Sequence, residues 1–405
     1  MNILFIVHRI PYPPNKGDKI RSFNELKYLS RKHEIHLVCL ADDPEDLKYV
    51  DHLKRYCKTV NVVHINPKLA KLKSIIYLFS RKPLSVPYFY SKKLQKTIDY
   101  LLSSIIFDCI FCFSSPMAEY IFRSNFQQPA TRIMDFVDID SDKWKQYISY
   151  SSFPLSWIYK LEGKRLEKYE RKISERFQFC AVVSQKEAEI FRRFAHNGNI
   201  MVIPNGVDSQ FFHPAMFKEQ RARSKEHRAI IFTGAMDYFP NIDGVLYFQK
   251  EILPLIEKEV PDVKFYIVGS NPTQKIRMMR EEENIEVTGY VDDIRPYISK
   301  ASVSVVPLRI GKGIQNKILE AMAMGVPVVA TSQAIAGIEV ENGKEIFIED
   351  QPQRFANRVV KLIKDEDLRK SISIQARQLV EKKYNWEVNL TRLEKVLEES
   401  RQGLI

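Results

Sequence analysis

The sequence predicts an α/β protein built from two doubly wound domains, each a parallel β-sheet covered by helices. The chain has 405 residues, 45% hydrophobic and 28% charged, enough for two or three globular domains and unlike a disordered, collagen-like or disulfide-rich chain. Short apolar runs alternate with longer amphipathic runs, as parallel strands buried on both faces alternate with their covering helices. Because the alternation occurs twice, we expect two domains that face each other across a ligand-binding cleft.

The first half of the chain holds five expected strands and two clear helical patterns. The strands are expected at Ile3–Val7, Ile35–Leu40, Val60–Ile65, Phe107–Phe113 and Arg132–Phe136, and the helices at Asp18–Arg31 and Pro116–Arg123. Cys109 and Cys112 lie in the fourth strand. We interpret them as buried thiols, because neither a second ligand pair for zinc nor an activating helix N-terminus is evident.

The second half repeats the pattern. Strands are expected at Ala229–Thr233, Lys264–Val268, Ile285–Val287, Ser302–Val306 and Val326–Ala330, and helices at Gly244–Glu259, Asp292–Ser299, Ile314–Met324 and Trp386–Ser400. Two prolines and an Asn-Gly turn in Met201–Pro214 mark the boundary. We therefore predict a first domain at 1–200, a second at 201–384 and a terminal helix within 385–405, for which a return to the first domain is one option.

Residues Leu155–Arg176 form a further helical pattern near the end of the first half. A broken apolar stripe runs along one side and charged residues fill the others. This pattern is typical of a solvent-facing connecting helix.

The N-terminal segment 1–14 has a short apolar run without a basic leader or a small-residue cleavage site, so we read it as a buried strand rather than a signal peptide. No run reaches the 18 or so apolar residues of a membrane span. A cytoplasmic protein is therefore expected.

Basic side chains concentrate in residues 52–98, where no acidic residue occurs. This window holds eleven positive charges, against a net charge of +12 for the whole chain. Apolar residues are interleaved with them: Ile75, Ile76, Tyr77, Leu78, Phe79, Tyr88, Phe89 and Tyr90. The combination favours an anionic membrane surface. An ordinary solvated face is the main alternative, and nucleic acid is the least expected partner.

The strongest candidate for chemistry is Pro307–Thr331, PLRIGKGIQNKILEAMAMGVPVVAT. It begins at the end of an expected buried strand, and Gly311 and Gly313 precede a helix. A glycine-rich turn into a helix N-terminus presents free N–H groups and a positive dipole end to an anion. Three cations flank this point, Arg309, Lys312 and Lys317, and Gln315, Asn316 and Glu320 follow. A carboxylate there can accept the paired hydroxyls of a ribose, so the segment predicts a nucleoside-diphosphate site.

Together with Asn205–Asp208 and Phe212–Pro214, this segment resembles the nucleotide-sugar glycosyltransferases of family 4. The resemblance implies the GT-B architecture of two facing Rossmann-like domains. Several blocks are most similar to a bacterial subgroup associated with exopolysaccharide and exosortase (PEP-CTERM) gene clusters: RIPYPPNKGDKIRSF, DFVDIDSDKW, VSQKEAE and TGAMDYFPNIDGVLYF.

The resemblance assigns roles and also exposes departures around the donor. Glu320 matches the second glutamate of the family's Glu-x7-Glu motif, which binds the donor ribose. Eight positions earlier, Lys312 replaces the first glutamate. A cation cannot accept hydrogen bonds from sugar hydroxyls, so we expect Lys312 to contact the diphosphate.

A second departure is that the loop Thr233–Tyr238, beginning Thr233-Gly234, lacks the Arg and Lys that typical members carry. Arg309, Lys312 and Lys317 are the nearest replacements for stabilising the leaving diphosphate. Gly17 matches the phosphate-approaching loop after the first strand, although 15–21 equally suits a plain loop and helix start. Gly269 and the exit of the next strand, Gly289–Val291, can approach the nucleobase, with Val291 as the candidate contact, although both equally suit ordinary strand exits.

On the acceptor side, Phe113 occupies the place of a histidine found in many members, which puts a general base there in doubt. Ser114 remains able to orient an acceptor. The acidic run Asp135–Asp142 can be read as a metal site, but we prefer Asp135 or Asp138 facing the acceptor. Asp18, Lys19 and Arg21 are weaker candidates, able to meet donor or acceptor.

These observations predict a retaining, nucleotide-sugar-dependent hexosyltransferase, with Lys312, Arg309 and Asp135 as candidate catalytic residues. The donor would be a co-substrate, and neither a tightly bound cofactor nor a metal is expected. The acceptor would be an oligosaccharide or lipid-linked glycan of exopolysaccharide or cell-surface polysaccharide synthesis, reached at the inner face of the membrane. Alternatives are an epimerase of the same architecture and a non-enzymatic module that binds anionic membranes.

Overall fold

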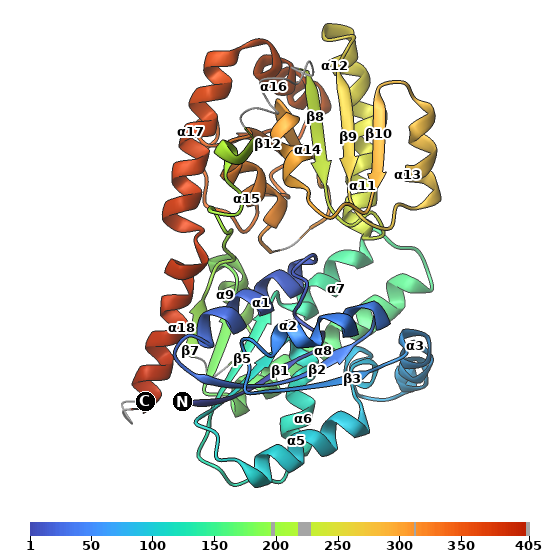
Figure 1. Cartoon of the computed structure of the whole chain (residues 1–405). Coiled ribbons are helices and arrows are strands. Elements are labelled where there is room, and N and C mark those ends of the chain that lie inside the picture. Colours follow the sequence, from blue (N-terminus) through green and yellow to red (C-terminus); the bar gives the residue numbers. More distant parts are fainter. Residues whose placement is uncertain (196–198, 218–227, 312, 402–405) are drawn as a thin grey trace. The chain divides into compact units, whose positions relative to one another are not determined.

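A computed structural model describes residues 1–195, 199–217, 228–311 and 313–401 (Figure 1). The chain divides into two compact units. Unit 1 comprises residues 1–204 and the end of the chain from residue 390, and unit 2 comprises residues 205–389. Each unit is a parallel β-sheet with helices packed against it, which confirms the predicted α/β class.

The sheet of unit 1 has seven parallel strands in the order β3-β2-β1-β4-β5-β6-β7. Their bounds are β1 Asn2–Val7, β2 Glu34–Ala41, β3 Thr59–His64, β4 Cys109–Phe113, β5 Thr131–Val137, β6 Phe179–Val182 and β7 Asn199–Val202. The strand order reverses at β1, which pairs with β2 on one side and β4 on the other. Ligands bind outside the carboxyl ends of such strands, so a ligand of unit 1 is expected at this edge.

Helices cover both faces of this sheet, with α1 and α2 on one face and α5 and α6 on the other (Figure 1). Their bounds are α1 Gly17–Leu29, α2 Val50–Leu53, α3 Pro67–Ile76, α4 Ser85–Tyr88, α5 Lys92–Ser104, α6 Ala118–Arg123, α7 Asp140–Ile148, α8 Leu155–Arg176 and α9 Gln185–Arg192. The last helix, α18, spans Trp386–Arg401, and the unit boundary falls within it.

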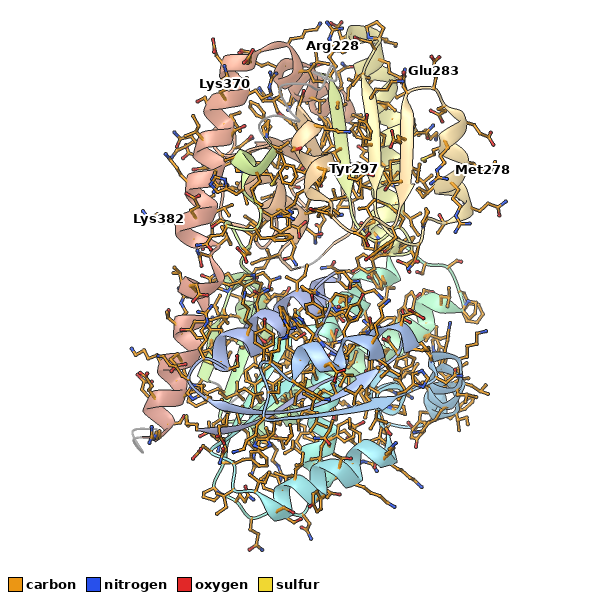
Figure 2. The ribbon with its side chains drawn as sticks, viewed as in Figure 1. Arg228, Met278, Glu283, Tyr297, Lys370 and Lys382 are labelled. Carbon is orange, nitrogen blue, oxygen red and sulfur yellow. The ribbon has the colours of Figure 1, made fainter. Side chains whose placement is uncertain are left out.

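Unit 2 contains a six-stranded sheet in the order β10-β9-β8-β11-β12-β13. The strands are β8 Ala229–Thr233, β9 Lys264–Val268, β10 Ile285–Gly289, β11 Val303–Val306, β12 Val328–Ala330 and β13 Phe347–Ile348. The helices are α11 Phe239–Tyr247, α12 Leu253–Glu259, α13 Gln274–Met278, α14 Arg295–Lys300, α15 Asn316–Ala323, α16 Pro352–Lys364 and α17 Glu366–Lys383. Here the strand order reverses at β8, between β9 and β11. Side chains fill the space between sheet and helices (Figure 2).

The expected helix Leu155–Arg176 forms with these bounds as α8, but the prediction that it is a solvent-facing connector is wrong. It packs in unit 1 and buries Glu162, Leu166 and Glu170, among others. Glu162 accepts hydrogen bonds from the backbone N–H groups of Leu84 and Ser85, at 2.7 and 3.2 Å. Buried carboxylates capping other segments interrupt the apolar stripe, which is why the sequence pattern resembled an exposed helix.

Smaller differences concern short strands and bends. The strands β6, β7 and β13 were not expected, and the helix expected over Gly244–Glu259 contains a π-helical segment at Phe248–Ile252 between α11 and α12. The two cysteines of β4 are buried free thiols, as predicted. None of the helices in the described part of the chain has the length and apolar character to cross a bilayer.

Candidate active site

The carboxyl edge of the unit 2 sheet is built around two glycine turns. Gly234 follows β8 with φ +151°, and Gly269 follows β9 with φ +156°. A Cβ added to Gly269 would lie 1.7 Å from the carbonyl oxygen of Gly234, so only glycine fits at this position. The two backbones therefore touch at the point where the strand order reverses, next to the buried Thr233.

Lys317, in the first turn of α15, reaches this place from another element. Its Nζ atom donates a hydrogen bond of 2.7 Å to Oδ1 of Asn241 and lies 4.0 Å from the centroid of the Phe232 ring. The same atom lies 2.9 Å from the position that a Cβ on Gly234 would take. Asn241 also donates from Nδ2 to the carbonyl oxygen of Ala235. The loop after β8 has no cation of its own, yet a cation from α15 lies beside it.

Burial disfavours the charged forms of Lys317 and of Glu320, three residues further along α15. It lowers the pKa of the Lys317 ammonium to about 7, although Glu320 partly opposes the shift. It likewise raises the pKa of Glu320 to about 7, partly opposed by Lys317. Within the described residues, the hydrogen-bonding partner of the ammonium is the neutral Asn241 amide, and Glu320 makes no side-chain hydrogen bond. Both groups are thus available to an external ligand.

Side chains from elsewhere in unit 2 hydrogen-bond to the turn before α15 and to its first residue. Gly313 has φ +65°, and Gln315 is the extended N-cap residue. The Gln333 side chain donates to the carbonyl oxygen of Gly311 at 2.6 Å, and Asn316 accepts from Asn205 at 3.1 Å. No acidic residue lies in the first turn of the helix, so its positive end is not neutralised there. Lys312, the candidate in place of the family's first glutamate, lies outside the described residues.

Arg309 and Val291 follow other strands of the same sheet, β11 and β10. The Arg309 guanidinium forms a two-point ion pair with Asp243 of α11, at 3.0 and 2.5 Å, and stacks over Tyr247. The Arg309 guanidinium is therefore already bound to a carboxylate of unit 2. Val291 follows the edge strand β10, which is separated from β8 by β9.

The carboxyl edge of unit 1 is dominated by a buried ion pair. Asp135, at the end of β5, accepts from Nε and Nη2 of Arg21 at 2.9 and 2.6 Å, and both side chains are 0% exposed. Its other oxygen accepts from the N–H of Val137. Arg21 also donates to the carbonyl oxygen of Ile203 at 2.8 Å. Asp135 and Arg21 thus satisfy each other inside unit 1, which differs from our expectation that they face substrates.

The neighbouring charged groups are also paired. Asp18 is contacted by His8 at 3.1 Å and Arg9 at 2.9 Å. Although burial opposes it, these two hydrogen bonds hold the pKa of Asp18 below its usual range. Lys19 donates to Asp46 at 2.6 Å and is almost completely buried, so it is not open to phosphate as expected. Gly17, the first residue of α1, is exposed, and a Cβ there would meet open space.

Ser114 and Asp138 are the partly exposed acceptor-side candidates. Ser114 has φ +76°, and its N–H donates to the carbonyl oxygen of Asp135. Phe113 is buried, and the His8 ring stacks on it at 5.9 Å. The acidic run does not converge: across the described ranges, no three His, Cys, Asp or Glu side chains are placed to hold a metal ion.

Asn241 is the residue that the sequence did not reveal. It lies in the TGAMDYFPNIDG block, but no spacing rule links it to Lys317, 76 positions later. Only the fold brings the two side chains together.

Comparison with known proteins gives this geometry its context. Residues 227–365 match the family described as Glycosyl transferases group 1. The chain also resembles the capsular polysaccharide biosynthesis glycosyltransferase CapM of Staphylococcus aureus, with 25% identity over 58% of this chain and 68% of CapM. The chain is a nucleotide-sugar-dependent glycosyltransferase with the GT-B fold.

Other similarities cover more of this glycosyltransferase. An uncharacterised protein from the cps region of Klebsiella pneumoniae is 20% identical over 95% of this chain and 96% of its own length. Among solved structures, sucrose-phosphate synthase from Thermosynechococcus elongatus has a TM-score of 0.76 at 17% identity, with both chains covered completely. HepE of Anabaena, solved in complex with UDP, has a TM-score of 0.70 at 16% identity, over 98% of this chain and 100% of HepE.

Proposed function

We propose that this glycosyltransferase moves a sugar, with retention of anomeric configuration, from a nucleoside-diphosphate sugar to a hydroxyl of a lipid-linked glycan. The process would be bacterial exopolysaccharide or cell-surface polysaccharide synthesis. The observation that carries the proposal is the partly buried Lys317 ammonium beside the Gly234 turn, held by a neutral amide. A buried cation without an anionic partner is costly unless a ligand supplies one.

The donor would lie along the carboxyl edge of unit 2. Its diphosphate would meet Lys317, Lys312 and the N–H groups before α15, with Gly313 and Gln315 allowing close approach. Glu320 would accept the ribose hydroxyls. The backbones at Thr233, Gly234 and Gly269 would line the phosphates, with Val291 toward the base. HepE is described in complex with UDP, which makes UDP the first nucleotide to test.

Retention without a base at the Phe113 position follows from a front-face reaction. The bond between the sugar C1 and the β-phosphate oxygen breaks while the acceptor oxygen bonds to C1 on the same face. The acceptor proton passes to the departing phosphate oxygen, so the diphosphate is the base. The enzyme then mainly positions the reactants and stabilises the leaving charge, the task proposed for Lys317. Ser114 and Asp138 would orient the acceptor, with Gly17 near the phosphates.

The relatives support the acceptor class. One relative, 28% identical over 52% of this chain and 56% of its own length, is named as an Escherichia coli galactosyltransferase acting on GlcNAc-diphosphoundecaprenol. A lipid-linked acceptor would place the enzyme peripherally at the cytoplasmic face of an anionic membrane. We further propose that catalysis needs no metal or tightly bound cofactor.

A thermal-shift panel of UDP, GDP, ADP, dTDP and CMP, with and without EDTA, tests the donor site. A ligand at 100 times its Kd stabilises the native state by about 2.7 kcal/mol. One diphosphate should raise the melting temperature regardless of EDTA, and Lys317→Met should clearly reduce the shift. Lys382→Met is the matched control, because Lys382 lies exposed on α17 in the same unit (Figure 2). No shift with any nucleotide would contradict the proposal, and a shift that EDTA removes would contradict metal independence.

Once a donor and acceptor are found, NMR of the product's anomeric proton decides the stereochemistry. Retention requires the same anomeric configuration as the donor, and inversion would exclude the front-face reaction.

A further inference from the structure

Helix α3, Pro67–Ile76, exposes its large apolar side chains, whereas an ordinary surface helix buries them. The side chains that pack onto unit 1 are small: Ala70 and Ser74 are buried. The large apolar ones are exposed, with exposed fractions of 65% for Leu69, 61% for Leu72 and 73% for Ile76. At 3.6 residues per turn, these three lie on the side opposite Ala70 and Ser74. The helix therefore presents a stripe of large apolar side chains to its surroundings.

The stripe continues beyond these three residues. Ile75 is 55% exposed, and Phe79, in the 3-10 turn that follows the helix, is 92% exposed. We call Leu69, Leu72, Ile75, Ile76 and Phe79 the apolar ridge. Exposed apolar side chains gathered in this way mark an interaction site, unlike single scattered ones.

Positive charge accompanies the ridge. Lys68, Lys71 and Arg81 are exposed, and none of them has an acidic partner within the described residues. Other cations of the basic window 52–98 are neutralised locally: Lys54 pairs with Asp51, Lys58 with Glu34 and Lys82 with Glu119. The charge that remains unpaired therefore includes the cations beside the ridge.

The aromatic residues of the same window divide differently from the sequence-based expectation. Phe89 and Tyr90 pack against the hydrophobic core of unit 1 and are only partly exposed. Exposed apolar area in this window thus belongs to α3 and the turn after it.

The ridge also lies near the edge of the sheet where substrates are expected. Helix α3 begins three residues after β3 ends at His64, and all strands of this sheet are parallel. The beginning of α3 is therefore on the same edge as Ser114 and Asp138. A surface that binds the ridge would therefore lie close to the edge of unit 1 at which the acceptor is proposed to bind.

We propose that the apolar ridge inserts into the boundary between headgroups and acyl chains of an anionic lipid bilayer, with Lys68 and Lys71 among the headgroups. Apolar burial and attraction to anionic lipid add together in such helices. A protein partner is less well matched, because cations beside the ridge would need acidic partners, whereas anionic headgroups surround an inserted helix on all sides. The inference deepens the proposed function by naming the lipid surface that would bring the acceptor.

Co-sedimentation of the full chain with lipid vesicles, without nucleotide or acceptor, tests this. The wild type should bind vesicles of phosphatidylcholine mixed with phosphatidylglycerol, and bind phosphatidylcholine alone less well. The double variant L72E/I76E should lose at least about tenfold in affinity, because it replaces two apolar side chains by charges that the acyl boundary and the anionic headgroups both disfavour. K68Q/K71Q should lose about fivefold for each cation at low salt and less at high salt.

The matched control is M278E/I374E, which introduces the same charge at apolar side chains of similar exposure, 54% and 56%, in unit 2. Met278 lies on α13, on the outer side of that unit (Figure 2). The control should bind vesicles like the wild type. All these variants should keep the nucleotide thermal shift, so a failed donor site and a failed membrane site give different results.

Three outcomes would overturn the inference. They are L72E/I76E binding like the wild type, wild type binding neutral and anionic vesicles equally, and wild type binding neither. In the last case, self-association removed by L72E/I76E would reassign the ridge to an interface between copies of the chain.

Discussion

The two units hold their inward-facing cations in opposite ways. In unit 1, Arg21 is paired with Asp135 and Lys19 with Asp46, each at 2.6 Å. In unit 2, Lys317 is held by the amide of Asn241 and by no carboxylate among the described residues. Unit 1 therefore neutralises its internal charge with its own residues, whereas unit 2 keeps a cation whose anion would come from outside. The difference separates charges that hold the fold from a charge available for binding.

The comparison predicts the largest effect for Arg21→Met. Removing one member of a buried ion pair leaves the other charge uncompensated and typically costs 3–5 kcal/mol. We expect the free energy of unfolding to fall by about that much, measured by denaturant titration followed by circular dichroism. The nucleotide thermal shift should persist in the folded fraction. A change below about 1 kcal/mol would show that Asp135 finds another partner or is protonated.

The second prediction is that Lys317→Met keeps its stability but loses nucleotide affinity, the reverse of Arg21→Met. No carboxylate loses a hydrogen-bonding partner, so the free energy of unfolding should be unchanged or higher. Affinity for the nucleoside diphosphate should drop by about 10- to 100-fold, because a hydrogen bond to a charged group contributes about 1.5–3 kcal/mol. Isothermal titration calorimetry measures the loss. Strong destabilisation without loss of affinity would mean that Lys317 serves the fold, as Lys19 does.

The third prediction concerns pH. Because burial lowers the pKa of Lys317 to about 7, the free enzyme loses its positive charge as pH rises above 7, while bound diphosphate favours the charged form. Binding then takes up one proton, and Kd should rise about tenfold for each pH unit above 7. Lys317→Arg, whose side chain stays charged, should flatten this dependence. An equally steep rise in the arginine variant would place the titrating group elsewhere.

Glu320 should make the nucleotide affinity depend on pH below 7 as well. Burial raises its pKa to about 7, so it becomes protonated as pH falls below 7 and loses acceptor capacity for the ribose. Affinity should therefore be highest near pH 7. Glu320→Gln should remove the dependence below that pH at a cost in affinity.

A smaller effect is expected for Asn241→Ala. It removes the acceptor that positions the ammonium, so Kd should rise by about fivefold, equivalent to about 1 kcal/mol. A double-mutant cycle with Lys317→Met separates positioning from direct contact, since the two losses should not add if Asn241 acts through Lys317. Additive losses would contradict that role.

The smallest effect is expected for Arg309→Gln. Its ion pair with Asp243 is half exposed, so the free energy of unfolding should change by less than about 1 kcal/mol. Asp243→Asn is the matched variant and should behave alike in stability. If Arg309→Gln alone weakened nucleotide binding tenfold, Arg309 would belong to the donor site despite its pairing.

The sequence allowed the α/β class and most central strands to be predicted, because strands buried on both faces leave continuous apolar runs, as in Ile3–Val7 and Ala229–Thr233. Short strands such as β13, Phe347–Ile348, carry too few residues to show a pattern. At the edge of unit 2 proposed to bind the donor, the glycine-rich turn and Lys317 were recognisable by local spacing. Asn241 was not, since its role depends on a contact across the sheet. The state of Asp135 was equally hidden, because a carboxylate that faces a ligand and one that faces Arg21 look the same in sequence.

The helix α18 bears on the order in which the protein can be completed during translation. Leu390, Leu393 and Leu397 are buried, Arg392 donates to the carbonyl oxygen of Val202, and Glu394 contacts His33. Unit 1 begins at the first residue yet obtains these contacts only from residues made after all of unit 2. While the ribosome still holds the end of the chain, the first unit to be synthesised is therefore the one left unfinished.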